Sequence, residues 1–596
     1  MTCQIDFEPL GRRISCPEGT TIFEAARTAG IFLSTICGGK QTCGRCKIKV
    51  ISGSVSALKE SERTHLSEEE INEGFRLACA TQVLGRLKLY IPVASLLDIH
   101  YLQPDDQQSK TAREPKVSVV HSVKLSGQSS STPEFELKYL QKELKRLSKL
   151  ENLTATGSAL VNIQKVMQNS ESFVNILVRK NEVIGIYPCN RKILGMAIDL
   201  GSSTLVGSLI DMDTGEAFTR QTMMNPQVSY GDDVMSRISF AMEGNGDILR
   251  KTALEAIDNL ITEAVNDPEE IAGIAICGNT AMHHLLLGLP VRQLGTAPYR
   301  PAVCHSMQIA ARDLHLPVAP EAAVYFLPNM AGFIGGDHVA MILATGIDKT
   351  DKNVIGIDIG TNTEITLATK NTLTGLSCAS GPAFEGAGIS HGMRAISGAI
   401  DRVIIDGNGI HTNVINDGKP IGICGSGIID TLSELRRLHI INRRGVLAEN
   451  PRVRRVARGH EFVLAAGDIT GTGRDIVVTQ RDIGKIQLAK AAIRAGIDIL
   501  LGNVGLRENE IDEIIVAGTF GYGLNLCSAI NVGLFPPMPE DRFKQVGNAA
   551  AEGARLTLFS EKARHTAEEI VQRVNYIELT THPEFTRQFS HALRFP

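Results

Sequence analysis

The sequence predicts a multidomain α/β protein with three folded units. At roughly 100–200 residues per domain, its 596 residues correspond to about three to five domains. A cysteine-rich loop lies near the N-terminus, and a strand-turn-strand pattern occurs twice in the second part of the chain. We therefore predict folded units over 1–93, 115–190 and 191–596, a linker at 94–114, and a second half of the large unit that begins near residue 353.

The composition describes a protein without a strong charge bias. Hydrophobic residues make up 43% of the chain, charged residues 21%, and the formal net charge is −4. This balance argues against a nucleic-acid or membrane-surface protein, which would carry a basic excess. No stretch approaches the ~18 consecutive apolar residues of a membrane span, and the first residues lack the apolar core of a secretory signal. We expect a cytoplasmic protein that binds neither nucleic acid nor membrane.

The first unit has the strand and helix pattern of a β-grasp fold. Residues 2–8 and 11–16 alternate in hydrophobicity as a pair of strands, and 20–30 form a short amphipathic helix behind a threonine cap. Residues 47–55 and 85–91 supply further strands.

This unit contains four cysteines with metal-ligand spacing: Cys37, Cys43, Cys46 and Cys79. The pattern is C-x5-C-x2-C, then 32 residues before the fourth cysteine. Three thiolates on one tight loop and a fourth from a distant segment are typical of a ferredoxin-type [2Fe-2S] cluster. Glycines in the loop supply the backbone freedom to curl around the metal: Gly38, Gly39 and Gly44. A structural zinc ion held by the same four thiolates is the alternative.

Over residues 1–93 the sequence resembles the [2Fe-2S] ferredoxins. The five-residue gap between Cys37 and Cys43 departs from the four-residue gap of plant-type ferredoxins and is similar to the adrenodoxin-type loop. The resemblance implies a cluster bound by the four cysteines and an electron-transfer role.

The second predicted unit is small. Residues 101–114 are polar and contain proline, which is typical of a linker. After them, the pattern predicts a strand at 117–125, helices at 136–150 and 157–168, and a hairpin within 175–188. This is a compact α+β module, and we assign it no chemistry.

The large unit contains an internal repeat. Residues 195–216 and 355–369 each run from an apolar strand through Asp and Gly into small hydroxyl or amide residues and a second strand, about 159 residues apart. An Asp at a strand end can hold a hydrated Mg²⁺, and the turn after it directs N–H groups and hydroxyls at phosphate oxygens. We expect Asp199 and Asp358 to face each other across a cleft. The predicted phosphate-binding residues are Gly201, Ser202, Ser203, Thr204, Gly360, Thr361, Asn362 and Thr363.

Two later glycine-rich segments, 421–435 and 513–525, can let backbone approach a base and ribose closely. Each is also compatible with an ordinary strand-to-helix turn, but their position behind two Asp-Gly hairpins favours nucleotide binding. The predicted adenosine-binding residues are Gly422, Gly425, Ser426, Gly427, Gly518, Thr519 and Gly521.

This order of motifs resembles the actin-like ATPase superfamily, which includes sugar and acetate kinases and the seventy-kilodalton heat-shock chaperones. The resemblance implies a duplicated fold with ATP and Mg²⁺ in a cleft between two halves. A phosphate loop of the type G-x4-G-K-[ST] is absent from the sequence. Asp199 and Asp358 are the predicted catalytic carboxylates, and Glu364, just after the second hairpin, is the candidate for positioning the hydrolytic water.

A [2Fe-2S] ferredoxin joined to a middle module and an actin-like ATPase resembles the reductive activators of corrinoid-dependent methyltransferase systems. Residues 479–501 are also similar to a helix of that family, whereas 528–596 lack the cysteines of its [4Fe-4S] branch. The resemblance implies an ATP-hydrolysing corrinoid reductase that passes one electron to the Co(II) corrinoid of a corrinoid protein or methyltransferase, restoring Co(I). It further implies an upstream low-potential electron donor and a homodimer.

Two other functions remain open: an actin-like small-molecule kinase with a redox-regulatory ferredoxin, and an ATP-independent electron carrier. A kinase needs a general base beside its substrate hydroxyl, and no sugar- or acetate-binding signature is evident.

The expected reduction potentials explain why ATP would be needed. Plant-type [2Fe-2S] centres lie near roughly −400 mV, the Co(II)/Co(I) couple is expected to be lower, and every ~59 mV uphill costs a factor of ten for one electron.

Overall fold

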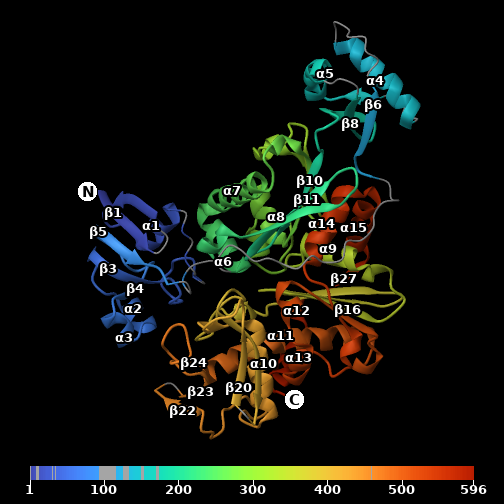
Figure 1. Ribbon diagram of the computed structural model, residues 1–596. Coiled ribbons are helices and arrows are strands. Elements are labelled where there is room, and N and C mark those ends of the chain that lie inside the picture. The colour runs from blue at the N-terminus through green and yellow to red at the C-terminus, as the bar shows by residue number, and fades with distance from the viewer. Residues whose placement is uncertain are drawn as a thin grey trace.

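The computed structural model describes most of the chain. The described residues are 2–8, 12–29, 31, 33, 35, 37–92, 95, 116–124, 133–148, 153–169, 173–231, 233–407, 409–457 and 459–596. The predicted linker at 94–114 lies outside the described residues, apart from residue 95. Figure 1 shows the N-terminal unit at left in blue, a small unit at upper right in cyan, and the large unit between and below them.

The N-terminal unit is a five-stranded sheet of order β2-β1-β5-β3-β4. Strand β1 pairs antiparallel with β2 and parallel with β5. Helix α1 packs its buried Ile22 and Phe23 into the same core as Ile5 and Phe7, and Thr21 caps its first turn. The elements are β1 (Thr2–Glu8), β2 (Arg12–Pro17), α1 (Ile22–Thr28), β3 (Lys47–Val55), α2 (Glu60–His65), α3 (Glu68–Asn72), β4 (Phe75–Leu77) and β5 (Val83–Tyr90).

The second unit is a four-stranded sheet of order β6-β8-β9-β7 with two helices. Leu140 and Leu144 of α4 and Ile163 of α5 share one hydrophobic core with the strands. The elements are β6 (Val119–Lys124), α4 (Pro133–Ser148), β7 (Thr154–Ala155), α5 (Gly157–Asn169), β8 (Phe173–Arg179) and β9 (Glu182–Pro188).

The large unit contains two six-stranded sheets that share the arrangement of five strands. The shared order is β12-β11-β10-β13-β15 in the first sheet and β18-β17-β16-β25-β26 in the second. The sixth strand, β14 or β27, lies at opposite ends of this order, beside β15 in the first sheet and beside β18 in the second. In each sheet the first strand of the half, β10 or β16, pairs antiparallel with its successor and parallel with β13 or β25. The strands are β10 (Leu194–Leu200), β11 (Thr204–Asp211), β12 (Ala217–Met224), β13 (Ile271–Gly278), β14 (Met307–Ala310), β15 (Ala323–Phe326), β16 (Val354–Ile359), β17 (Thr363–Ala368), β18 (Leu373–Cys378), β25 (Glu513–Ala517), β26 (Phe543–Gln545) and β27 (Val574–Tyr576). The predicted duplication is confirmed.

Two small sheets and the helices complete the large unit. The small sheets are β20-β19-β21 and β22-β23-β24. Their strands are β19 (Ala399–Asp406), β20 (Gly409–Val414), β21 (Gly422–Ile423), β22 (Val453–Val456), β23 (Gly459–Ala465) and β24 (Ile476–Thr479). The helices are α6 (Val234–Phe240), α7 (Gly246–Ala264), α8 (Thr280–Leu287), α9 (Gly336–Thr345), α10 (Gly425–Arg437), α11 (Gln480–Val504), α12 (Thr519–Gly523), α13 (Leu526–Asn531), α14 (Ala549–Phe559), α15 (Glu561–Arg573) and α16 (Phe585–Ala592). Among the described residues, no helix combines the length and apolar character needed to cross a bilayer.

Helices α9 and α14 pack against each other between the two large sheets (Figure 1). Their backbones meet at Gly553, where a Cβ atom would lie 2.1 Å from the carbonyl oxygen of Ala340. Because a Cβ cannot approach backbone that closely, only glycine permits this contact. The contact therefore sets how closely the two halves approach beside the cleft.

We predict that Gly553→Ala destabilises the large unit by about 1–3 kcal/mol, since the added methyl forces α9 and α14 apart. The matched control is Gly502→Ala in α11, where an added Cβ meets no heavy atom within 4 Å. That change should be neutral or stabilise by up to roughly 1 kcal/mol, because alanine has the higher helix propensity. Thermal unfolding followed by circular dichroism measures both. Equal melting temperatures for the two variants would contradict the close-contact argument.

Candidate functional site

The four predicted cluster ligands come together at one end of the N-terminal sheet. Cys37, Cys43 and Cys46 lie on the loop between α1 and β3, and Cys79 follows β4. The loop curls through glycines with positive φ, which side chains rarely adopt: Gly38 (+59°), Gly39 (+91°) and Gly44 (+69°). Cys46 and Cys79 are buried, with 1% and 4% exposure, whereas Cys37 and Cys43 are half-buried.

The thiols form two pairs, Cys37 with Cys43 and Cys46 with Cys79, each within hydrogen-bonding reach. The Cys43 thiol lowers the pKa of Cys37 to about 4, and Cys79 together with burial raises the pKa of Cys46. The two pairs are neighbours, because the charge of Cys43 acts on Cys46 and that of Cys37 acts on Cys79. Two adjacent pairs of thiols suit a rhomb with two irons, each iron bound by one pair.

Glu62 of α2 fixes the segment that carries the fourth thiol. Its carboxylate is fully buried and accepts two hydrogen bonds from Arg76 at 2.8 Å, one from the Leu77 N–H at 3.1 Å and one from the Thr81 hydroxyl at 3.0 Å. Burial raises the pKa of Glu62, but Arg76 and the backbone N–H groups outweigh it, so the net pKa is lowered. This network positions the turn at Cys79.

The two Asp-Gly hairpins of the large unit face each other across a cavity of about 330 Å³. This volume is at the lower end of small-molecule sites. Asp199 ends β10 beside Cys277 of β13, and Asp358 lies on β16 beside Ala517 of β25. The predicted residues that line the cavity are Asp199, Gly201, Ser202, Ser203, Thr204, Asp358, Gly360, Thr361, Asn362, Glu364, Gly425, Ser426 and Gly518.

Four predicted residues lie behind the cavity wall. The Thr363 hydroxyl is 2.8 Å from that of Ser380, away from the cleft. The backbone of three glycines packs against neighbouring segments: Gly422, Gly427 and Gly521. Thr519 begins α12 next to the cavity, and the structure does not describe its side chain.

Two of the lining glycines are required by close contacts. A Cβ on Gly518, whose φ is +88°, would lie 2.8 Å from the Asp358 carboxylate. A Cβ on Gly425 would lie 1.8 Å from the carbonyl oxygen of Phe384. Phe384 stacks on Phe520 with ring centroids 5.0 Å apart and an angle of 16° between the planes. The second half therefore offers a flat aromatic and backbone wall of the kind that an adenosine base can pack against.

Carboxylates dominate the floor of the cavity. Burial raises the pKa of Asp199 to about 6, and burial with the charge of Asp199 raises that of Asp358 to about 7. Burial and the charges of Asp199 and Asp358 likewise raise the pKa of Asp337 to about 7, and burial with the charges of Asp337 and Asp358 raises the pKa of Glu364 well above its ordinary value. Three of the four remain partly accessible through the cavity, so a cation can reach them.

Sequence reasoning missed several residues of this site. Asp337, in the first turn of α9, looks in sequence like a solvated helix start. Asn548 donates a hydrogen bond to Asp199 at 2.8 Å from a helix cap far along the chain. Glu385 and Arg394 come from the glycine-rich segment 381–400, and their side chains lie 4.0 Å apart.

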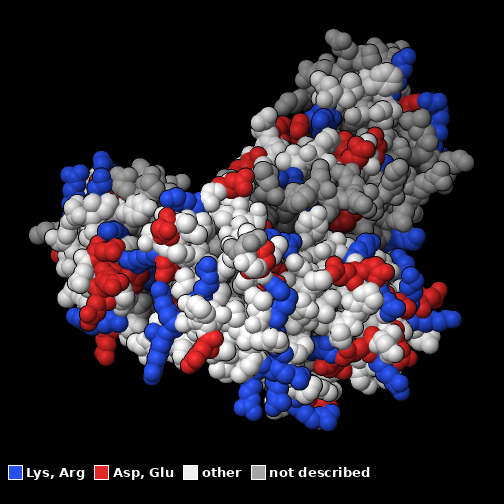
Figure 2. All heavy atoms as spheres, turned by 60° about the horizontal axis from the view of Figure 1, so that its bottom comes forward, with Lys and Arg blue, Asp and Glu red and all other residues white. Residues whose placement is uncertain are grey.

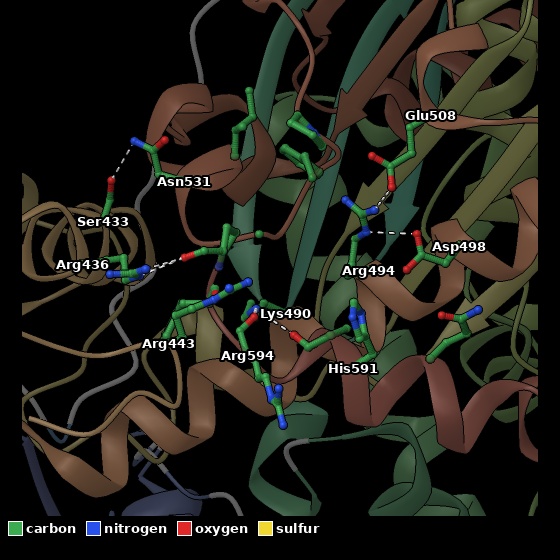
Figure 3. Close-up of a pocket in the computed structure, with 18 of the residues that line it drawn as sticks. Ser433, Arg436, Arg443, Lys490, Arg494, Asp498, Glu508, Asn531, His591 and Arg594 are labelled. Atoms are coloured by element: carbon green, nitrogen blue, oxygen red, sulfur yellow. Dashed lines mark hydrogen bonds and ion pairs between the residues drawn. The ribbon is translucent and has the colours of Figure 1, made fainter. Parts of the chain in front are cut away.

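A larger cavity, of about 1510 Å³, lies elsewhere, among α10, α11, α13 and α16, and contains none of the predicted residues (Figure 3). Its cations hold the segment 592–596. Lys490 donates to the carbonyl oxygens of Ala592 and Arg594, both at 2.7 Å, and Arg436 donates to Pro596 at 2.9 and 2.8 Å. These contacts give the cavity a structural role.

Three family descriptions match the chain. They are "2Fe-2S iron-sulfur cluster binding domain" over residues 5–84, "RACo middle region" over 194–350 and "C-terminal domain of RACo the ASKHA domain" over 352–596. The second and third together span the unit that the sequence predicted as one duplicated ATPase.

Full-length relatives match as well. The corrinoid activation enzyme RamQ of Eubacterium limosum is 30% identical over 611 aligned positions, covering 98% of this chain and 97% of its own length. A solved reductive activator for corrinoid,iron-sulfur protein superposes with a TM-score of 0.74 at 34% identity, over 100% of this chain and 98% of that one. The chain belongs to the family of reductive activators of corrinoid proteins. A more distant relative, the Co(II) methylated amine-specific corrinoid protein reductase of Methanosarcina barkeri, is 25% identical and covers 64% of this chain and 72% of its own length.

Membership in the activator family confirms the predicted resemblance and the predicted fold class. It also assigns the two chemistries to separate parts of the chain, iron-sulfur binding to the N-terminal unit and the actin-like fold to the large one. The comparisons do not address individual residues, so the assignments to cysteines and cleft residues rest on the geometry above.

We predict that Glu62→Ala lowers the local stability of β4 and β5 by about 3–5 kcal/mol, because it leaves a buried guanidinium without its partner. In the parent chain this contribution is present above pH ~4.3 and is lost as the pH falls through the lowered pKa of Glu62. Amide exchange over residues 75–90 measures the change. The matched control, Glu60→Ala in the same helix, alters an exposed side chain and should stay within about 0.5 kcal/mol. Similar exchange in both variants would refute the positioning role.

Proposed function

We propose that this chain is an ATP-dependent activator that passes one electron to the Co(II) corrinoid of a partner protein and so restores Co(I). The proposal rests on two features that this one chain combines: the paired thiols of the N-terminal unit and the carboxylate-lined cleft between the two actin-like halves. Relatives named as a corrinoid activation enzyme and a corrinoid protein reductase support the same reaction. We further propose a low-potential electron donor upstream and a homodimer.

In the cleft, the backbone N–H groups and hydroxyls of the two hairpins bind the phosphates of ATP. Asp199 and Asp358 line this cleft and would hold Mg²⁺, which is commonly bound in proteins through one or two carboxylates together with phosphates and waters. Phe384, Phe520 and the backbone at Gly425 form the wall for the adenosine.

Asp337 and Glu364 have different roles toward the attacking water. A general base works best when its pKa is near the operating pH, and the pKa of Asp337 is about 7. Burial and the charges of Asp337 and Asp358 raise the pKa of Glu364 well above its ordinary value, which favours its neutral form, and the neutral acid can donate a hydrogen bond. We propose that Asp337 accepts the proton of the water while Glu364 helps to position it.

In the N-terminal unit, Cys37 and Cys43 would hold one iron, and Cys46 and Cys79 the other. The cluster supplies one-electron transfer when it is bound. The protein contributes the buried Cys46–Cys79 side, which excludes water, and the half-buried Cys37–Cys43 side, whose Gly38 packs against Tyr230 of the large unit.

Two variants separate the two chemistries. Cys79→Ala should abolish the iron-sulfur absorption and the appearance of Co(I) absorption in a corrinoid protein, yet retain nucleotide binding. Asp358→Ala should retain a reducible cluster but lose ATP-dependent cobalt reduction. Thr361→Ala removes one hydroxyl worth roughly 0.5–1.5 kcal/mol and should weaken ATP binding only several-fold. Cobalt reduction by the cluster-free variant, or full ATP-dependent activity in Asp358→Ala, would sink the proposal.

The proposed roles of Asp337 and Glu364 predict that replacing each acid by its amide has different effects on the rate of ATP hydrolysis. Asp337→Asn should lower ATP hydrolysis by about 10²–10⁴-fold, since the general base is lost. Glu364→Gln should retain most of the rate, because the amide of glutamine can also donate a hydrogen bond to the water. Steady-state ATPase assays with the corrinoid partner present measure both. In the parent chain, activity should rise with pH through about 7 as Asp337 loses its proton. A reversed ranking of the two variants would refute the assignment.

A further inference from the structure

The cluster-binding loop packs directly on the large unit. Arg45, the residue before Cys46, donates through Nη2 to the carbonyl oxygens of Gly386 at 2.8 Å and Ile389 at 3.5 Å, and through Nη1 to that of Gly392 at 3.3 Å. We call these three carbonyls the carbonyl cage. Gly386 has a φ of +77°, and a Cβ on Gly392 would lie 2.2 Å from the Gly386 oxygen. The cage therefore depends on glycine at both positions.

The same loop also touches the first half of the large unit. A Cβ on Gly38 would lie 2.6 Å from the carbonyl oxygen of Tyr230, and the Arg27 guanidinium stacks 4.7 Å from the Tyr230 ring centroid. The segment of Tyr230 is tied to the first phosphate hairpin, because Asn225 donates through Nδ2 to the Gly201 carbonyl at 2.8 Å. The N-terminal unit thus rests on both halves, each contact adjoining one wall of the cleft.

Glu385 links the carbonyl cage to the cleft. Its carboxylate accepts hydrogen bonds from the Ser203 hydroxyl at 2.9 Å and from the Thr361 hydroxyl, one on each hairpin. These are two of the predicted phosphate-binding hydroxyls. A bound phosphate would compete with Glu385 for both and would repel its charge. The next residue is Gly386, whose carbonyl holds Arg45.

We propose that a nucleotide polyphosphate in the cleft releases the N-terminal unit from this docked position, by displacing Glu385 and with it the carbonyl cage. The proposal rests on the nucleotide site proposed above. Two further ion pairs of the interface, Lys40–Glu243 at 3.5 Å and Arg474–Glu73 at 2.9 Å, join exposed side chains, and pairs of this kind contribute little. Figure 2 shows the acidic side chains on the N-terminal unit at left, next to the large unit. Release uncovers the Cys37 edge of the cradle for a partner protein.

Thermodynamic linkage between docking and nucleotide binding allows the proposal to be tested by measuring nucleotide affinity. If nucleotide weakens docking, then loss of docking must tighten nucleotide binding by the same factor. In the iron-loaded full chain, Arg45→Ala should bind a non-hydrolysable ATP analogue about fivefold or more tightly than the parent by calorimetry, although Arg45 does not line the cleft. The matched control Lys40→Ala should change the affinity by less than about twofold. Visible absorption verifies that each variant retains its cluster.

A second measurement follows the docked unit itself. In the parent, the analogue should speed amide exchange over residues 22–46, none of which lines the cleft. In Arg45→Ala, this exchange should already be fast and should not respond. If Arg45→Ala loses its cluster, Arg27→Ala breaks the Tyr230 contact from α1, away from the cysteines, and should shift both readouts in the same direction.

The outcomes distinguish the two proposals. If the parent binds the analogue but exchange over 22–46 stays unchanged, or if Arg45→Ala binds no more tightly, the release mechanism is wrong while the nucleotide site stands. If calorimetry detects no binding to the parent, the nucleotide site itself is wrong, and the release mechanism falls with it.

Discussion

The repulsion among the carboxylates at the floor of the cleft is the constraint on which the rest of the structure depends. Asp199, Asp337, Asp358 and Glu364 come from both halves of the large unit, and burial raises the pKa of all four. Like charges in a desolvated site cannot all ionise, so the cleft must take up protons or a cation near neutral pH. The halves are thus held against their own electrostatic repulsion, by the α9–α14 contact and by the hydrogen bonds of Glu385. A Mg²⁺–phosphate ligand would replace the protons and change this balance.

The N-terminal unit meets the large unit through a surface of a different character. Its contacts are a guanidinium on backbone carbonyls, a cation–π stack and exposed ion pairs such as Arg474–Glu73 at 2.9 Å. No hydrophobic cluster among the described residues joins the two units, because the core of the N-terminal unit is complete in itself. Polar interfaces of this kind resemble transient protein–protein contacts and permit domain motion. Such an interface suits the proposed role of the N-terminal unit, which would contact both an electron donor and an acceptor.

Much of the fold follows from local pattern, whereas part of the site does not. The repeated Asp-Gly hairpins revealed two matching sheets, because strand periodicity and turn residues are local properties. The cluster-binding loop could also be predicted from the sequence, since ligand spacing reflects the size of the metal group. The position of Asp337 in the cleft could not be predicted, because one acidic residue in the first turn of a helix has no local signal that distinguishes a cleft from solvent. The Arg45–Gly386 contact joins residues 341 positions apart, and no periodicity encodes it.

The size of the proposed coupling limits what it can achieve. Allosteric couplings are typically about 1–3 kcal/mol, which corresponds to roughly 40–130 mV for one electron. A release step of that size can decide when the cradle is open to a partner, but it cannot by itself drive a reduction that is more steeply uphill. In the proposed reaction, the remaining free energy would act where the corrinoid is bound, through a complex that prefers one state of its environment. The proposed docking step would then govern access of the electron carrier to its partner, and the proposed ATP hydrolysis would govern the energetics of the transfer.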